Sequence, residues 1–388
     1  MQNVLIRLIL SLLLYSANVG ASELRVIGFA FSGDNTSISS RFPYLSQIEQ
    51  DNLSSNESIS RIINNRLQPL TNPNIIIVKD GSQFSVRATD QAITSVLLMT
   101  GETVLIENYG NYYKVFINLR ADALIFDYKS KSILKTYPLN LVIFDAVSGN
   151  QPPSQEYIKN KINEYIKTTN KEGLISQYLE KVQHATLVNK GVHTFQIGKV
   201  EVLSDAVSIF PENFRNDSNL LKDVIADSFG SALTSETNIS LMPSKVGNAL
   251  GVISMKLENN DDFVTLKIGD ADYLFDVSVN KFVKVKQQET SAQVSYLYGV
   301  STTINLYEPL SNTKILESNF KNGEISISPI NKISTDDYPA YYDTLNNLFK
   351  KLSSAIKTND MKWVNVSASS PVVSKQIVKI KNLFEEGM

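Results

Sequence analysis

The spacing of apolar residues predicts that short strands and amphipathic helices follow one another through the first half of the chain. The run at 24–31 is continuously apolar and ends at the turn signal Ser32-Gly33-Asp34, which is typical of a buried strand. Farther on, Ile59, Ile63 and Leu67 recur at helical spacing behind the capping box Ser54-x-x-Glu57. The predicted order is strand, helix, strand, helix, strand, strand, helix, at 24–31, 54–68, 74–78, 91–100, 112–127, 132–145 and 153–166.

The second half repeats much of this order. A strand-like run at 195–210 precedes a helical stripe at 221–233 and a short strand at 239–242. Two hairpins follow, one predicted to turn at Val279-Asn280 and the other formed by 295–307 and 314–320. Pro339 then lies near the start of a helix whose apolar face includes Leu345, Leu348 and Leu352.

The hairpins give the best match between the two halves. Ile125-Phe126-Asp127, followed by Ile133-Leu134, corresponds to Leu306-Tyr307-Glu308, followed by Ile315-Leu316, with one residue inserted. Strands share composition, so chance is the alternative, but the shared order of elements favours duplication. We therefore predict an α+β fold of two tandem domains, each a mixed or antiparallel sheet with helices packed on it. The predicted division is an N-terminal leader at 1–21, a first domain at 22–170, a helical connector at 171–191, a second domain at 192–358 and a tail at 359–388.

This order of elements resembles the amino-terminal domain of TolB and the periplasmic domain of the curli secretion pore. In those families the central hairpin reads as an apolar strand, an acid, a polar or basic turn and a second apolar strand. The segment from Ala123 through Asp127 to Leu134 fits that description. The resemblance implies two copies of a TolB-like domain and a role in envelope assembly or secretion. No functional residue transfers, because the hairpin carries no diagnostic motif.

The N-terminal segment has the pattern of a secretory signal peptide. Arg7 supplies the positive charge, the run from Leu8 to Tyr15 supplies the apolar core, and Val19 and Ala21 are the small residues of a cleavage site. An uncleaved membrane anchor is the alternative, but the apolar run is shorter than the roughly 20 residues that span a bilayer. We expect cleavage after Ala21. Because a secreted eukaryotic protein would more often carry disulfides, the bacterial periplasm is the favoured location.

Composition narrows the possible functions. The 388 residues include 39 acidic and 37 basic side chains, so a general nucleic-acid binder, which would carry a basic excess, is disfavoured. The absence of cysteine excludes disulfides, thiolate metal sites and cysteine nucleophiles. His184 and His193 are nine residues apart, a spacing that neither a helix face nor a metal-ligand pair requires.

A search for catalytic motifs finds none of the nucleotide-binding, zinc-protease or serine-hydrolase signatures. The acidic stretch from Asn259 to Asp262, with Asp270 and Asp272 nearby, lacks the glycine and the ligand order of a calcium loop, so we interpret it as a solvated turn. We expect no metal and no cofactor.

Two groups of tyrosines are candidates for binding a partner. Exposed tyrosines often anchor protein interfaces, whereas in β-rich domains they more often lie on half-buried strands, and both alternatives stay open. The candidates are Tyr109, Tyr112 and Tyr113 around Gly110, and Tyr338, Tyr341 and Tyr342 around Pro339.

The tail is a further candidate. Val373, Ile377, Ile380 and Phe384 form an apolar stripe that suits either a helix or a strand, and 361–366 could add an edge strand. The stripe either completes the second core or docks to a partner.

The sequence thus predicts a non-enzymatic periplasmic scaffold or accessory protein of an envelope assembly or secretion machine. Its partners would be other envelope proteins, with no nucleic acid and no transmembrane segment after removal of the signal peptide. Two alternatives remain: a protein that binds a small ligand between its domains, and a hydrolase that uses a pair of carboxylates in a cleft.

Overall fold

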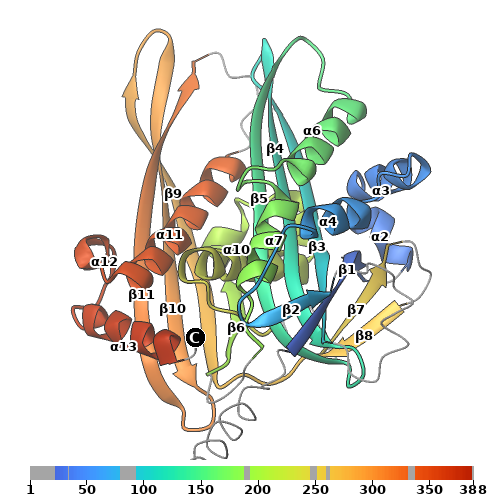
Figure 1. Ribbon diagram of the computed structural model, residues 1–388. Helices are drawn as coiled ribbons and strands as arrows, with labels where there is room; N and C mark the ends of the chain where they lie inside the picture. Colours follow the sequence, from blue (N-terminus) through green and yellow to red (C-terminus); the bar gives the residue numbers. More distant parts are fainter. Residues whose placement is uncertain are drawn as a thin grey trace, which may run out of the picture.

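Two β-sheets and the helices packed on them form the structure, a computed structural model that describes residues 22–33, 35–78, 93–187, 193–244, 251–258, 263–330 and 337–386 (Figure 1). The fold class is α+β, as predicted. The predicted signal peptide and the acidic turn at 259–262 lie outside the described residues.

The first sheet has the strand order β2-β1-β3-β4-β5-β8-β7. Strand β1 is parallel to β2 and β3, and β3, β4 and β5 form a long antiparallel meander. The strands of this sheet are β1 (Ser22–Ser32), β2 (Ile75–Val78), β3 (Ile93–Asn108), β4 (Tyr112–Asp127), β5 (Ser132–Ser148), β7 (Val252–Leu257) and β8 (Phe263–Lys267).

One face of the first sheet packs against helices whose apolar stripes the sequence indicates. In α4 the stripe of Ile59, Ile63 and Leu67 is buried, and in α6 Ile158, Ile162 and Ile166 are buried. The helices of the first half are α2 (Asn35–Arg41), α3 (Leu45–Ser54), α4 (Ile59–Leu67), α6 (Gln155–Lys167) and α7 (Leu174–His184).

The second sheet has the order β11-β10-β9-β6, which corresponds to the order β5-β4-β3-β1 within the first sheet. Strand β6 is parallel to β9, and β9, β10 and β11 form an antiparallel meander. Helices α10, α11 and α13 supply much of the core on one face of this sheet. Its strands are β6 (Phe195–Val202), β9 (Tyr273–Glu289), β10 (Gln293–Glu308) and β11 (Thr313–Pro329), and the helices of this half are α8 (Ser204–Val207), α9 (Glu212–Asn216), α10 (Ser218–Thr237), α11 (Tyr338–Thr358), α12 (Met361–Ser367) and α13 (Val373–Glu386).

The two sheets also share irregularities at corresponding places. The register of β1 on β3 shifts between Val26 and Phe29, and that of β6 on β9 shifts between Ile197 and Val200. The β4–β5 hairpin shifts between Ile125 and Phe126, and the β10–β11 hairpin shifts at the residues that the sequence aligns with them. This correspondence is what a duplication requires, although the tandem-domain division itself stays a prediction.

A hairpin from the second half joins the first sheet, so sheet membership does not follow the predicted boundary at 191. Strand β7 is antiparallel to β1 at Ala30–Ser32, and β8 meets β5 at Ser132. Glu258, at the end of β7, accepts hydrogen bonds from the backbone N–H groups of Ile59 and Ser60 (3.0 and 2.7 Å). A carboxylate at this position satisfies free donors at the start of α4 and so attaches the hairpin to the first half.

Several predicted elements need correction. The predicted helix at 91–100 is wrong, because its described part is the beginning of β3. The predicted hairpin turn at Val279-Asn280 lies inside β9, and the predicted strand at 195–210 ends at Val202. The predicted capping box at Ser54 is replaced by Ser58, whose side chain accepts from Arg61 N. The possible edge strand at 361–366 is helix α12.

Candidate functional site

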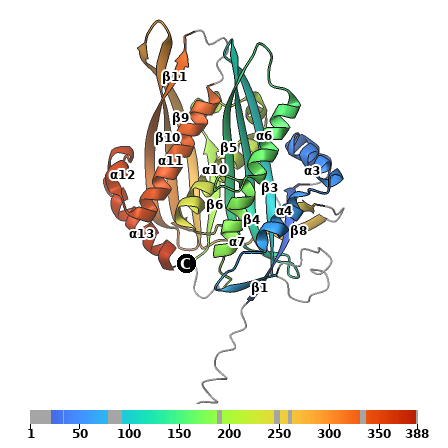
Figure 2. The same ribbon diagram turned by 45° about the horizontal axis from the view of Figure 1, so that its top comes forward.

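Both predicted tyrosine groups lie near the contact between the two halves. Tyr112 is half-buried, and the other five tyrosines are 8% exposed or less. Phe116 on β4 packs against the second group, since its ring centroid lies 6.1 Å from that of Tyr338 and 5.5 Å from that of Tyr342. In the views of Figures 1 and 2, α10 and α11 lie between the two sheets. The tyrosines therefore pack against this chain, and their binding to a separate partner stays a prediction.

The Tyr342 hydroxyl connects four elements at this contact. It accepts hydrogen bonds from the side-chain amides of Asn118 on β4 (2.6 Å) and Asn140 on β5 (3.2 Å). A hydroxyl–hydroxyl bond of 2.9 Å joins it to Ser228 on α10. Because such a network leaves few alternative arrangements, it fixes α10 and α11 against the first sheet.

A buried group of charges lies next to this network, around Arg120, which follows Asn118 by two residues on β4. Arg120 is 1% exposed, and its Nε lies 3.1 Å from Asp227 Oδ2 on α10. Gly101 faces Arg120 across a register shift, and a Cβ at position 101 would lie 1.9 Å from Arg120 Nη2. Glycine is therefore required here for the guanidinium to lie against β3 and reach α10.

Carboxyl groups around Arg120 have pKa values above their usual range. Burial and the charge of Asp227 raise the pKa of Asp122 and bring that of Asp223 to about 7. Burial also raises the pKa of Asp227 itself, although Arg120 and Arg41 oppose this shift. These carboxyls and arginines form one coupled group that ties the first sheet to α10.

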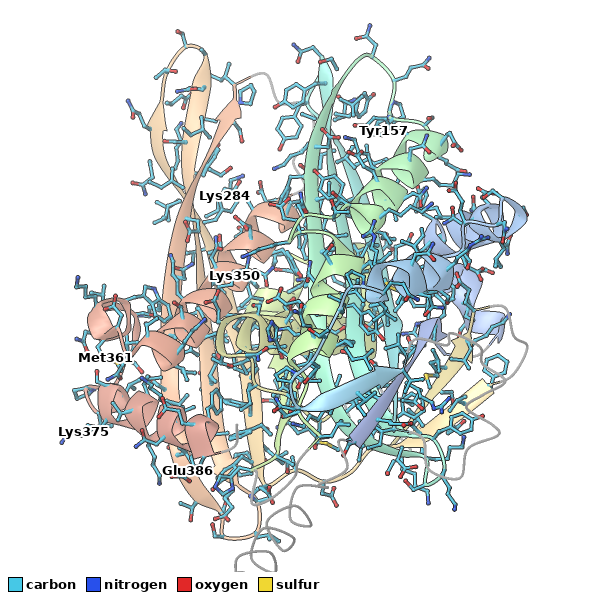
Figure 3. The ribbon with its side chains drawn as sticks, in the orientation of Figure 1. Tyr157, Lys284, Lys350, Met361, Lys375 and Glu386 are labelled. Carbon is cyan, nitrogen blue, oxygen red and sulfur yellow. The ribbon has the colours of Figure 1, made fainter. Side chains whose placement is uncertain are left out.

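A cleft of about 390 Å³ opens beside Asn140, between β5 and α7 on one side and α10 and α11 on the other. Its volume suits a small ligand. Among its lining side chains only Glu172 carries a carboxyl group, whereas hydrolysis by paired carboxylates needs two acids across the substrate. This cleft therefore does not supply the pair that the hydrolase alternative requires. Its lining includes Asn140, Phe144, Lys171, Glu172, Ser231 and Lys350, the last of which Figure 3 labels.

The tail completes the second core. Val373, Ile377, Ile380 and Phe384 are all 3% exposed or less, and the segment is helical. The ring of Phe384 lies 4.8 Å from that of Phe195 on β6. Of the two alternatives left open by the sequence, the structure shows core completion, because the second sheet itself covers the stripe. Docking of the tail to a partner stays without support.

His193 and Asp272, which the sequence analysis considered as candidates, each contact a neighbouring residue near the surface. His193 Nε2 lies 3.5 Å from Glu386 Oε2, and Asp272 accepts hydrogen bonds from the backbone and hydroxyl of Thr194. Within the described ranges, no group of three or more His, Asp or Glu side chains could hold a metal ion. No helix in the described part of the chain has the length and hydropathy to cross a bilayer.

The second sheet bears an apolar surface that the sequence reading missed. Strands β9, β10 and β11 extend beyond the helices as an arm, at the upper left of Figure 1. Its outward side, which we call the arm patch, is formed by Val283, Val285, Leu297, Ile325 and Ile327. Four of these are well exposed, Val283 at 41%, Val285 at 47%, Ile325 at 67% and Ile327 at 61%.

The opposite side of the arm faces the rest of the chain. Lys284 Nζ lies 2.7 Å from Asp337 Oδ2 at the start of α11, and the Tyr298 hydroxyl donates to Asp337 Oδ1 (2.8 Å). Figure 3 shows Lys284 where the arm approaches the first sheet. Because side chains alternate across a strand, residues next to Lys284 and Tyr298 point outward. The alternation Ile-Ser-Ile-Ser at 325–328 is the signal that could have revealed this surface, but it lies beyond the predicted strand end at 320.

Comparisons with known proteins assign no family. No family model and no curated protein matches the sequence. Among solved structures, the chain is similar to a DUF330 protein from Xanthomonas campestris (10% identity, 42% of this chain and 81% of that one, TM-score 0.23). It is also similar to a neuraminyllactose-binding hemagglutinin homolog from Helicobacter pylori (12%, 52% and 97%, 0.24) and a minor lipoprotein from Acinetobacter baumannii (10%, 47% and 100%, 0.22). At these TM-scores the likeness carries no functional argument.

Stability is expected to fall as the pH rises from 5 to 8. Burial raises the pKa of Glu49, Glu102 and Asp223 to about 7 in the folded chain. The stability that these protons contribute is complete below the unfolded pKa, near 4, and is lost as the pH rises through 7. One pKa unit corresponds to about 1.4 kcal/mol, and with solvent screening we expect a total loss of about 2–4 kcal/mol. Urea unfolding at several pH values measures it.

Glu102→Gln provides the matched test. The two carboxylate oxygens of Glu102 accept from the N–H groups of Tyr44 and Leu45 at the start of α3 (both 2.9 Å), and the single amide oxygen of glutamine can still accept one of these bonds. The variant should therefore show a flatter pH profile than the parent chain. A free energy of unfolding that increases from pH 5 to pH 8 would contradict the assignment.

Proposed function

We propose that this chain is a non-enzymatic scaffold or accessory protein of the bacterial envelope, exported to the periplasm, that acts by docking to other envelope components. The observation that carries the proposal is the arm patch, because contiguous exposed aliphatic side chains on a folded protein mark interaction surfaces. The arm that bears the patch is held by the Lys284–Asp337 contact, so it presents a preformed surface.

Other observations support a binding role over a catalytic one. The buried charges around Arg120 contact one another and join two elements of the fold, which is a structural arrangement. The cleft beside Asn140 offers one carboxyl group. Export is supported by the positive charge of Arg7, the apolar run from Leu8 to Tyr15 and the small residues Val19 and Ala21, which together have the pattern of a signal peptide. We also propose that the chain contains two TolB-like domains and takes part in envelope assembly or secretion.

Cell fractionation tests the proposal. In its own host, the chain is expected to sediment with the envelope, and Ile325→Ser combined with Ile327→Ser is expected to move most of it to the soluble periplasmic fraction. Both isoleucines are more than half exposed, so the variant should fold normally. Circular dichroism of the purified variant checks this.

Ile76→Ser is the control, because Ile76 is 53% exposed on β2 in the first sheet, away from the arm. It should leave the distribution unchanged. If the double variant and the control both stay with the envelope, the arm patch is not the docking surface and the proposal fails.

A further inference from the structure

The arm patch is a flat surface because two glycines lie within it. The register places Val283, Gly299 and Gly323 side by side in one row, and Val285, Leu297 and Ile325 in the next. A Cβ at Gly299 would lie 2.7 Å from Val283 Cγ2, and one at Gly323 would lie 3.1 Å from Leu297 Cδ1. The aliphatic side chains therefore lie across the glycine backbone and form one continuous layer.

Positive charge borders the patch at the end nearer the body of the sheet. Lys281 and Lys321 occupy the next row, both opposite Ser301, and both are exposed. No carboxylate of the described residues forms an ion pair with either lysine. The acids of the arm, Glu289 and Glu324, belong to the other side, where Glu324 pairs with Lys351 of α11. The outward side thus combines aliphatic groups with lysines and carries no acid.

The composition of this side distinguishes a lipid surface from a protein partner. Protein interfaces are enriched in aromatic residues, methionine and arginine and depleted in lysine. The arm patch and its border contain none of the enriched types and two lysines. Surfaces that bind at the bilayer interface combine buried apolar area with lysines or arginines that meet anionic headgroups.

The size of the patch argues against a second copy of the chain. The four well-exposed side chains present roughly 400 Å², which lies in the range of functional patches on monomeric proteins. A stable dimer buries about 800 Å² on each partner. Two such patches face to face would also bring lysines together without a carboxylate between them.

We propose that the arm patch docks onto the surface of an anionic phospholipid bilayer, with Val283, Val285, Ile325 and Ile327 at the level of the acyl chains and Lys281 and Lys321 against the headgroups. This inference rests on the proposed function and names the envelope component that the patch meets. No covalent step is involved, and the bound chain keeps the fold described above.

Vesicle sedimentation with the purified full chain, beginning at Ser22, tests this. We expect binding to phosphatidylcholine vesicles that contain 30% phosphatidylglycerol and much weaker binding to pure phosphatidylcholine. Ile325→Ser with Ile327→Ser should lower binding by about tenfold or more, because the apolar contact supplies most of the attraction. Lys281→Glu with Lys321→Glu should lower binding to the anionic vesicles by about tenfold or more and leave the weak binding to neutral vesicles unchanged.

Two matched controls separate the patch from general surface effects. Ile76→Ser removes an exposed isoleucine from β2, and Lys375→Glu reverses an exposed lysine on α13, which Figure 3 labels. Both should bind anionic vesicles like the parent chain. Equal loss in the controls, or no binding of the parent chain to anionic vesicles, would overturn the inference.

The remaining outcomes distinguish this inference from the proposed function. A concentration-dependent dimer in analytical ultracentrifugation that Ile325→Ser/Ile327→Ser abolishes would make the patch an interface between copies and overturn lipid docking. If fractionation depends on the patch while vesicles fail to bind, the docking role stands and the partner is a protein. If fractionation is independent of the patch, both proposals fail.

Discussion

Replacement of Arg120 by methionine is expected to lower the free energy of unfolding by about 3–5 kcal/mol at pH 8. Methionine fills a similar volume beside Gly101 but leaves Asp227 without the guanidinium that lies 3.1 Å from it. Burial already raises the pKa of Asp227, and loss of Arg120 removes the main opposing influence. A largely buried carboxylate must then stay charged without the guanidinium at its Oδ2 or take up a proton, and both cost stability.

The pH dependence of this loss identifies its cause. At pH 5 the carboxyls beside Arg120 bind protons more easily, so the variant should lose less stability there than at pH 8. Urea unfolding at both pH values measures the difference. A loss that is the same at both values would indicate a packing defect instead of an unpaired charge.

Two further variants serve as references. Arg120→Met combined with Asp227→Leu removes both charges and should recover much of the stability, since apolar residues can replace a buried ion pair at little cost. Lys351→Met breaks the exposed contact with Glu324, where both side chains are more than a third accessible, and should cost about 1 kcal/mol or less. Failure of the double variant to recover stability would contradict the proposed role of the pair.

The local pattern of apolar residues was sufficient to predict most of the helices and strands. The stripe at 221–233 gives α10, and the hairpin at 112–145 gives β4 and β5, because each contains its own periodicity. At residues 96–99 the local pattern predicted a helix, whereas the structure has part of β3. Val96, Leu97, Leu98 and Met99 are all fully buried, because both faces of β3 are covered. A strand buried on both faces shows no alternation, and periodicity cannot distinguish it from a buried helix.

Asn280 shows how a turn signal can have another meaning. The register of β9 on β10 shifts from Lys281 to Val279 and leaves Asn280 as the extra residue of a β-bulge. Its side-chain amide donates to Thr303 Oγ1 and Asn319 Oδ1 on neighbouring strands (3.0 and 3.1 Å). Asparagine is common in turns, so the sequence alone suggested a hairpin, whereas the partners that hold the bulge lie 23 and 39 residues away.

The candidate site was less predictable than the fold, because its members come from distant parts of the chain. Arg120 lies in an apolar strand and Asp227 in an amphipathic helix of the other half, and nothing local couples them. Gly101 directly follows the helix predicted at 91–100, whereas in the structure it lies within β3 and admits the Arg120 guanidinium. The sequence indicated Tyr338 and Tyr342 as candidates, but only the packing of α11 on β4 shows that their rings lie against Phe116.

Replacement of Phe384 by alanine is expected to lower the free energy of unfolding by about 3–5 kcal/mol, the range for a large aromatic side chain lost from a core. Phe384 is 3% exposed at the C-terminal end of α13, and its ring lies 4.8 Å from Phe195 and 6.5 Å from Phe275. All three rings belong to the core of the second half, which is closely packed and cannot collapse easily around the cavity. Chemical denaturation of the purified variant measures the loss.

Val378→Ala on the same helix is the matched control. Val378 is 39% exposed, so its truncation should cost less than about 1 kcal/mol while it leaves the helix intact. Deletion of 369–388 would remove the whole buried stripe and is expected to leave little soluble protein, since a domain of this size has only about 5–15 kcal/mol of net stability. If Phe384→Ala and the deletion both melt like the parent chain, α13 is not part of the core in solution, and a partner-binding role for the tail would have to be considered again.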